Sequence, residues 1–291
     1  MSTHQDKERD AHSGVETTGH EWDGIKELNN PLPKWWLQIF YATVIISLVY
    51  WVLFPAIPLV ESATTGVLGQ SDRADVVSDL EALRAQRAPT MAKLANAPLE
   101  AIEQDPDLLS FVLAAGASVF GDNCAPCHGS GAQGSVGYPN LIDDVWIWGG
   151  TLEDIRQTIR YGIRSDHSDT RISEMPAFGR DELLTKEQIA DLAQYVLSIS
   201  GQGGDAAAVL RAQPLFAEQC AVCHGEAGMG MREFGAPNLT DADWVYGSDL
   251  AAITETITNA RRGVMPAWTG RMDDATINAL AIYVHALGGG E

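Results

Sequence analysis

A continuous apolar run covers Trp35 to Phe54 and is interrupted only by Gln38, Thr43 and Ser47. About 20 residues at a helical rise of 1.5 Å match a hydrocarbon core of roughly 30 Å. Aromatic residues stand near both ends of the run, as at membrane interfaces, and Pro55 ends the helix. A long polar stretch precedes the run, and no small-x-small cleavage site follows it. We therefore predict an uncleaved membrane anchor helix over residues 35–54.

The segments on either side of this run differ in pattern. Residues 1–34 are mostly polar, and within them residues 1–20 are expected to be disordered, with His4, His12 and His20 solvated. Residues 55–106 are predicted to be a periplasmic helical connector, because residues 61–106 are Ala-rich and mostly helical in pattern. Its apolar stripe either folds back on the rest of the chain or binds a partner, and it is formed by Val76, Val77, Leu80 and Leu83.

Beyond residue 106 one helical pattern occurs twice. Each copy runs helix, loop, helix, loop, helix, without the alternation typical of strands. The matches extend over the whole copy and include Pro139-Asn140-Leu141 with Pro237-Asn238-Leu239, Met175-Pro176-Ala177 with Met265-Pro266-Ala267, and Tyr195 with Tyr283. We predict an all-α chain with two tandem domains, residues 107–200 and 206–291, joined by the Gly-rich linker 201–205.

The chain of 291 residues is acidic, with 19 Lys and Arg against 39 Asp and Glu and a formal charge of −20. A nucleic acid partner is excluded by this charge. A cationic protein partner fits it, because complementary fields raise the rate of encounter. The acidity also fits a simpler role in keeping an exported protein soluble.

All four cysteines lie in two Cys-x-x-Cys-His motifs, Cys124 to His128 and Cys220 to His224. Two thiols in one helical turn can attach the vinyl groups of a c-type haem, and the histidine that follows can bind its iron. Disulfides would not require the histidines, a four-cysteine zinc site usually has closer pairs, and a thioredoxin motif would occur once beside a βαβ pattern. We predict two covalently bound haem c groups, held through Cys124, Cys127, Cys220 and Cys223, with His128 and His224 on the irons.

The second axial ligand decides what each iron can do. Met175 and Met265 are the candidates because they recur at equivalent positions and each precedes a proline that stiffens its loop. Four other side chains could compete for the role of second axial ligand, but none has a counterpart in the other copy: Met229, Met231, His167 and His285. Each methionine is expected to serve the haem of its own repeat, although two abutting domains could also exchange these loops.

Histidine and methionine together fill both axial coordination positions of the iron. This predicts electron transfer without substrate chemistry. A di-haem peroxidase or a gas sensor would need an open iron, which the repeated methionines argue against. Six aromatic residues near these motifs have two alternative roles: they line the haem pockets, or they pack in the core. They are Tyr138, Trp146, Trp148, Trp244, Tyr246 and Trp268. Haem is attached to c-type cytochromes outside the cytoplasm, so residues 1–34 are expected in the cytoplasm and both haem domains in the periplasm.

The run from Glu21 to Trp36, which leads directly into the anchor, resembles subunit III of cbb3-type cytochrome c oxidases, the di-haem CcoP/FixP kind. The resemblance covers nearly the whole chain, including the Pro-Asn-Leu and Met-Pro-Ala signatures. It implies a subunit of an oxidase complex in the bacterial inner membrane, which passes electrons from a cytochrome c donor toward a mono-haem subunit and a haem-copper subunit. Oxygen reduction and proton pumping would lie on those other subunits. A free-standing membrane-anchored electron shuttle is the alternative.

Overall fold

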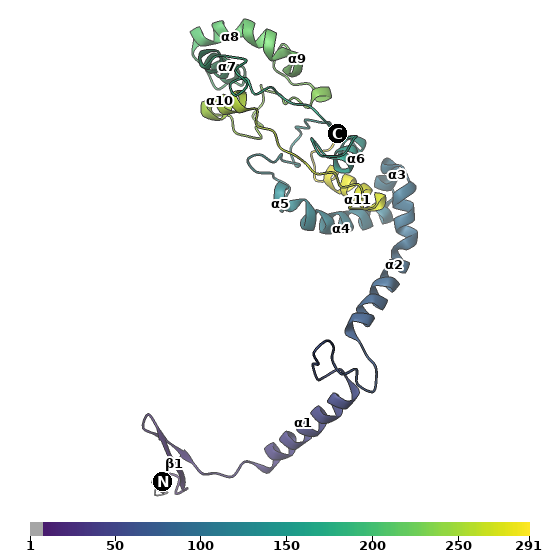
Figure 1. Ribbon diagram of the computed structural model, residues 1–291, viewed down its shortest axis with the longest axis vertical. Coiled ribbons are helices and arrows are strands. Elements are labelled where there is room, and N and C mark those ends of the chain that lie inside the picture. Colours follow the sequence, from purple (N-terminus) through teal and green to yellow (C-terminus); the bar gives the residue numbers. More distant parts are fainter. Residues whose placement is uncertain (1–7) are drawn as a thin grey trace. The chain divides into compact units, whose positions relative to one another are not determined.

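Helix α1 (Lys34–Leu53) carries the apolar run in a computed structural model that describes residues 8–291 (Figure 1). Two of its polar side chains bond within the helix: Thr43 Oγ1 donates to Phe40 O at 2.7 Å and Ser47 Oγ to Thr43 O at 2.8 Å. Such bonding is what a hydrocarbon environment requires of hydroxyl groups. Among residues 8–291, α1 is the one helix long and apolar enough to cross a membrane, and none of its side chains is buried.

A β-hairpin precedes the anchor helix. Strands β1 (Thr17–Trp22) and β2 (Ile25–Leu28) pair antiparallel around Asp23 and Gly24, whose φ angles of 51° and 85° suit a tight two-residue turn. The expectation of disorder is therefore wrong for residues 8–20, where the Asp-Gly turn signal outweighs the polar composition. Residues 1–7, with His4, lie outside the described part of the chain.

The described residues form two compact units, which meet between Ala85 and Gln86. Helix α2 (Asp72–Asn96) begins in the first unit, where Val76, Val77, Leu80 and Leu83 are exposed, and ends in the second. The second unit is helical, as predicted. Its further elements are α3 (Leu99–Gln104), α4 (Pro106–Asn123), α5 (Ala125–His128), α6 (Leu152–Tyr161), α7 (Lys186–Ile199), α8 (Ala206–Gln219), α9 (Ala221–His224), the 3-10 turn η1 (Arg232–Phe234), α10 (Leu250–Asn259) and α11 (Asp274–His285).

Short polar side chains start most of the longer helices. Asp105 accepts from the Asp107 and Leu108 amides at the start of α4, and Thr185 forms a reciprocal capping box at the start of α7. Each cap satisfies amides that the first helical turn leaves without a partner. The same role falls to Thr151, Asp205, Asp249 and Asp273.

The two repeats exchange their last helices. Helix α11, which ends the second repeat, packs on α4 and α6 of the first, whereas α7, which ends the first repeat, packs on α8 and α10 of the second (Figure 1). The aromatic pairs of the helix crossings show this directly: Phe120 meets Tyr283 with ring centroids 5.5 Å apart, and Phe216 meets Tyr195 at 4.8 Å. Each repeat therefore packs its last helix in the other repeat instead of closing on itself.

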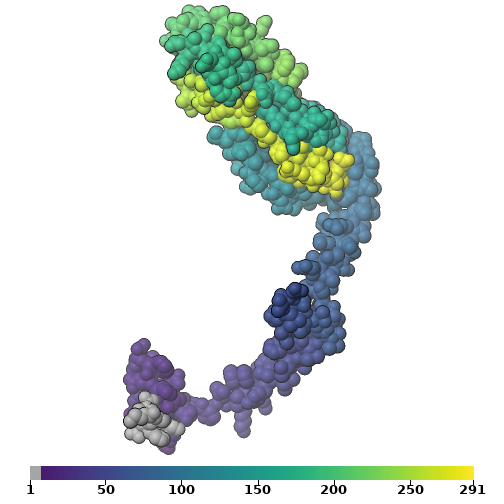
Figure 2. All heavy atoms as spheres, viewed as in Figure 1, coloured from purple at the N-terminus to yellow at the C-terminus, as the bar shows by residue number. Residues whose placement is uncertain are grey.

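We name the resulting bodies lobe A and lobe B. Lobe A consists of α3, α4, α5, α6 and α11, and lobe B of α7, α8, α9 and α10. The C-terminal segment, yellow in Figure 2, runs along both lobes as it passes from α10 to α11. The predicted halves 107–200 and 206–291 are tandem in sequence, but each contributes helices to both lobes.

The two connections between the lobes lie side by side. Ile163 and Met265 exchange two backbone hydrogen bonds of 3.0 Å, and the Phe178 amide donates to Ile257 O at 3.1 Å. Gly162 makes this approach possible, because at its φ of 71° an added Cβ would collide with the backbone of Met265. The crossing is therefore built by both repeats together.

Arg164 links the two connections where they lie side by side. Its guanidinium donates through Nε to Gly263 O at 2.7 Å and through Nη1 to Ser173 O at 3.0 Å, so one side chain joins both connections. The residue has a φ of 52°, a left-handed conformation that is uncommon for a residue other than glycine. These two hydrogen bonds offset the strain of that conformation.

The exchanged packing predicts different effects for two glycines of α4. A Cβ at Gly116 would lie 2.5 Å from the Tyr283 Cβ of α11, whereas a Cβ at Gly121 would meet nothing within 4 Å. Gly116→Ala is expected to lower the free energy of unfolding by about 1–3 kcal/mol through overpacking. Gly121→Ala is expected to raise it by up to about 1 kcal/mol through helix propensity. Urea unfolding followed by circular dichroism measures both, and equal effects would contradict the α4 to α11 contact.

Candidate haem sites

The two Cys-x-x-Cys-His motifs form matching short helices. Cys124 ends α4 and precedes α5, and the His128 amide donates to Cys124 O at 2.9 Å, which closes one helical turn. In the second motif the His224 amide donates to Cys220 O, also at 2.9 Å. One turn thus presents two thiols and one imidazole in each lobe.

Both motif histidines are held in one orientation by a carbonyl group. His128 Nδ1 lies 3.0 Å from Pro139 O, and His224 Nδ1 lies 3.0 Å from Pro237 O. A carbonyl can only accept, so Nδ1 carries the hydrogen and donates it. The Nε2 lone pair of each ring is left available for a metal ion, the arrangement found at most histidine ligands.

Burial keeps these imidazoles in the form that binds metals. Loss of solvent lowers the pKa of His128 and of His224 below the ordinary value, and the hydrogen bonds to Pro139 and Pro237 act in the opposite direction. A neutral imidazole, not an imidazolium, is the ligand form. Both rings are therefore neutral at pH 7, the form in which an imidazole can be an axial ligand.

The thiols suit thioether attachment. Burial, with a smaller contribution from the second cysteine of each motif, raises the pKa of Cys124 and of Cys220 to about 11. All four cysteines are free, with Cys127 exposed and the other three half-buried. Uncharged sulfur is favoured at the buried positions, as a thioether provides.

The donor set of each lobe fits a haem better than a bare metal ion. Within residues 8–291 no group of three or more His, Cys, Asp or Glu side chains converges on one point. One histidine alone cannot complete a coordination shell, whereas a porphyrin supplies four nitrogens of its own.

The exchanged helices bring each methionine to the motif of the other repeat. Met175 packs on the core of lobe B, together with Cys220 and Ala221 of the second motif. Met265 packs on the core of lobe A, together with Cys124 and Ala125 of the first motif. Both methionine side chains are half-buried.

The rival side chains lie elsewhere. Met229 is 68% exposed, and His167 stacks on Tyr161 with ring centroids 4.8 Å apart. His285 lies between Glu103 Oε1 at 2.9 Å and the Glu291 carbonyl at 3.1 Å, so both of its ring nitrogens are engaged. Met231 lines a hollow between the lobes.

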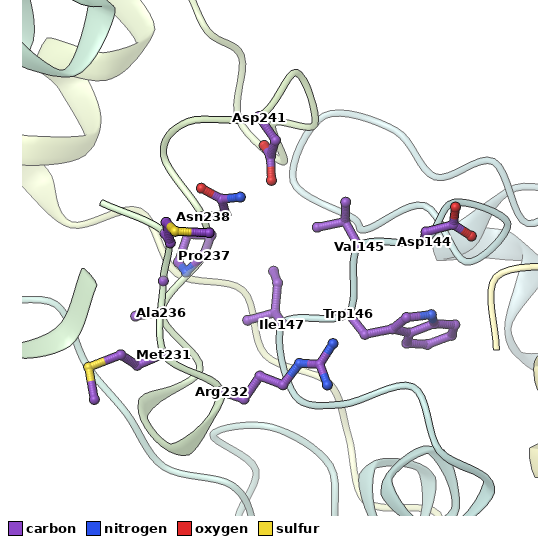
Figure 3. Close-up of a pocket in the computed structure, with 12 residues that line it drawn as sticks. Asp144, Val145, Trp146, Ile147, Met231, Arg232, Ala236, Pro237, Asn238 and Asp241 are labelled. Carbon is purple, nitrogen blue, oxygen red and sulfur yellow. The ribbon is translucent and has the colours of Figure 1, made fainter. Parts of the chain in front are cut away.

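That hollow, with a volume of about 280 Å³, adjoins the loop that orients His224 (Figure 3). Val145 and Ile147 of lobe A point into it toward Pro237 of lobe B, whereas the Trp146 ring points away. Arg232, on its rim, forms an ion pair with Glu291. Residues 144–147 of lobe A thus lie beside the loop of lobe B that orients His224.

The sequence reasoning did not assign a role to the carbonyls of Pro139 and Pro237. The repeated Pro-Asn-Leu motif was the available signal, but a backbone oxygen carries no side-chain signature. It also did not single out Met272, which packs on the lobe A core beside Met265. No second copy of Met272 exists in the first repeat, so the repeat pattern could not identify it.

Comparison with known proteins agrees with this reading. A family model described as the N-terminal domain of cytochrome oxidase-cbb3, FixP, matches residues 14–61, and one described as cytochrome c oxidase, cbb3-type, subunit III matches residues 112–196 and 207–284. The cbb3-type cytochrome c oxidase subunit FixP of Bradyrhizobium diazoefficiens is 54% identical over 288 residues, 98% of each chain. Subunit CcoP of Cereibacter sphaeroides is 54% identical over 276 residues, 94% of this chain and 95% of its own. Subunit CcoP of Azospirillum brasilense is 52% identical over 292 residues, 98% and 99% of the two chains.

The helical lobes and the paired motifs define a c-type cytochrome that carries two covalently bound haem c groups and transfers electrons. More particularly, the chain belongs to the subunit III family of cbb3-type cytochrome c oxidases. The all-α fold, the two tandem cytochrome domains and the role as an oxidase subunit were all predicted from the sequence, and these predictions are confirmed.

Proposed function

We propose that each lobe binds one haem with ligands from both repeats. In lobe A, Cys124 and Cys127 would hold the porphyrin, and His128 and Met265 would be the protein ligands of its iron. In lobe B the corresponding residues are Cys220, Cys223, His224 and Met175. The observation that carries this assignment is the packing of each methionine on the core that contains the other repeat's cysteine motif.

This ligand set supports outer-sphere electron transfer. Haem, when bound, would supply an iron that can change between the ferrous and ferric states. A fixed imidazole and a thioether on a Pro-stiffened loop would keep its coordination unchanged in both states. The exclusion of water by the buried aromatic and aliphatic side chains limits reorganisation on each electron transfer.

The two haem lobes are proposed to lie in the periplasm, with residues 8–33 in the cytoplasm and α1 in the inner membrane. Covalent haem attachment outside the cytoplasm supports this orientation. The charge pattern near α1 adds little, because Lys26 and Lys34 precede the helix and Arg73 follows it. A cysteine-accessibility assay with an added Cys at Ser13 and at Ser78 distinguishes the two sides of the membrane.

The partners are proposed to be the haem-copper catalytic subunit, a mono-haem cytochrome c subunit and a cytochrome c donor. Three relatives are named as subunits of a cbb3-type oxidase, which supports an oxidase complex. The formal charge of −20 favours a cationic donor. Electrons then pass from the donor through the two lobes toward the oxygen-reducing subunit.

Mild detergent extraction followed by affinity purification of the tagged chain tests this assignment. The expected result is recovery of a haem-copper subunit with oxygen consumption that depends on reduced cytochrome c. A variant with Cys124→Ala, Cys127→Ala, Cys220→Ala and Cys223→Ala is the control, because it cannot hold haem covalently. Recovery of the haem-loaded wild-type chain alone, without oxygen consumption, would support the free-standing shuttle instead.

A further inference from the structure

Two aromatic side chains at equivalent repeat positions join the lobes. Trp148 precedes α6 of lobe A, and Tyr246 precedes α10 of lobe B, 98 residues later. Each ring packs on a glycine of the opposite lobe: Trp148 on Gly235, and Tyr246 on Gly137. These glycines are also 98 residues apart, so the interface repeats the same contact in both directions.

Both glycines lie in the loops that orient the proximal histidines. Gly137 stands between His128 and the Pro139 carbonyl that accepts from it, and Gly235 stands between His224 and Pro237. A Cβ at Gly235 would overlap the Trp148 ring, whereas a Cβ at Gly137 would lie 3.6 Å from the Tyr246 ring. Each ring therefore fills the space between one lobe and the other lobe's histidine loop.

A backbone hydrogen bond adds a direct link. The Gly137 amide donates to Val245 O at 2.7 Å, one residue before Tyr246. From the His128 ring the link continues through the Pro139 carbonyl and the backbone back to Gly137. A short series of covalent and hydrogen bonds thus leads from the proximal ligand of lobe A into the aromatic segment of lobe B.

An arginine holds each ring from the other side. The Arg171 guanidinium lies 5.5 Å from the centroid of Trp148, and that of Arg261 lies 4.9 Å from the centroid of Tyr246. Arg171 is itself bonded to Asp154 of α6. Arg261 donates to Ala252 O at 2.7 Å on α10. Both rings are thereby fixed between a cation and a glycine.

We propose that Trp148 and Tyr246 are positioning residues that set the rate of electron transfer between the two haem sites. The step moves one electron from a ferrous to a ferric site, and no bond forms or breaks. An electron tunnels faster through bonded, close-packed atoms than across a gap. The two rings and the hydrogen bond from the Gly137 amide to Val245 O therefore provide the electronic coupling between the two haem sites. This proposal rests on the proposed assignment of one haem to each lobe.

The test uses the full chain in detergent with both haems attached. NMR exchange spectroscopy of the half-reduced protein measures the rate between the haems, and a redox titration measures both potentials. Trp148→Leu and Tyr246→Leu are each expected to slow the exchange severalfold, with both reduction potentials unchanged. Trp148→Phe and Tyr246→Phe retain a ring and are expected to keep a rate close to that of the parent chain.

Glycine variants provide a matched pair. Gly235→Ala is expected to slow the exchange, because the new methyl group displaces Trp148. Gly201→Ala has a comparable positive φ, 75° against 55°, and meets nothing within 4 Å, so it is expected to leave the rate unchanged. Equal rates in these two variants would contradict the proposal.

Hydrogen exchange at the Gly137 amide distinguishes two roles of the rings: coupling the haem sites for electron transfer, or only holding the two lobes together. The proposal predicts that this amide stays protected in the Leu variants while the rate falls. Loss of protection together with the rate, or equal slowing by Leu and Phe, would give the rings a docking role only and overturn the proposal. Absence of two covalent haems, or of any exchange in the parent chain, would instead contradict the underlying assignment.

Discussion

Replacing Met175 with alanine is expected to open one of the two haem irons to carbon monoxide and to lower the reduction potential of that haem. The Met175 thioether packs on the same core as Cys220, and its loss is expected to leave the iron five-coordinate. Axial ligands control potentials over a range of roughly 0.8 V, so the shift should be large. A carbon monoxide difference spectrum of the reduced protein measures the reactive fraction, which should be half of the total haem.

Met265→Ala is expected to give the same reactive fraction through the other haem, and the double variant to make all of the haem reactive. Met229→Ala is the control, because this side chain is 68% exposed and contacts neither core. It should leave both potentials and the spectrum unchanged. A single methionine variant that binds no carbon monoxide would remove that residue from the proposed ligand set.

Cutting the linker between the repeats is expected to leave the two fragments associated. A protease site inserted at Gly203 lies in an exposed segment, and cleavage there severs the connection between α7 and α8. Helices α7 and α11 then hold the fragments together, because each is packed in the lobe of the other repeat. Their large buried side chains are Ile189, Leu192 and Val196 on α7 and Ile277, Leu280, Ile282 and Val284 on α11.

Burial of one such side chain stabilises by about 1.5–3 kcal/mol, and a Kd of 1 μM corresponds to about 8 kcal/mol. The cleaved chain should therefore elute as one species in gel filtration and separate only in denaturant. Insertion of the same site within the exposed segment 67–70, which lies between α1 and α2, is the control, since that cut should release residues 71–291. Two linker-cut fragments that elute apart, each with one haem, would contradict the helix exchange.

Much of this architecture could be predicted from the sequence. The apolar run of α1, the duplicated helices and the two cysteine motifs each depend on local patterns that survive without tertiary information. The proximal histidines follow from the motif itself. The predicted disorder of residues 1–20 was wrong where β1 begins, because a short hairpin depends on one turn, Asp23-Gly24, more than on composition.

The exchange of α7 and α11 between the repeats could not be predicted from the sequence. Tyr195 and Tyr283 are equivalent, as are Phe120 and Phe216, so either pairing buries the same kinds of side chain. What distinguishes them is the path of the connections, where Ile163 bonds to Met265 and Phe178 to Ile257. These are backbone contacts between distant segments, and no side-chain pattern records them. The contacts of Trp148 and Tyr246 with opposite glycines arise from the same interface.

The identity of the methionine on each iron is the central claim, and methyl NMR of a single-haem chain tests it most directly. In the reduced state the methyl group of an axial methionine is strongly shifted by the haem ring current. A chain with Cys124→Ala and Cys127→Ala keeps only the haem of lobe B and should show one such signal from methyl-labelled methionine. The exchanged fold predicts that Met175→Leu abolishes this signal and that Met265→Leu leaves it in place. Loss of the signal in Met265→Leu with retention in Met175→Leu would contradict the account.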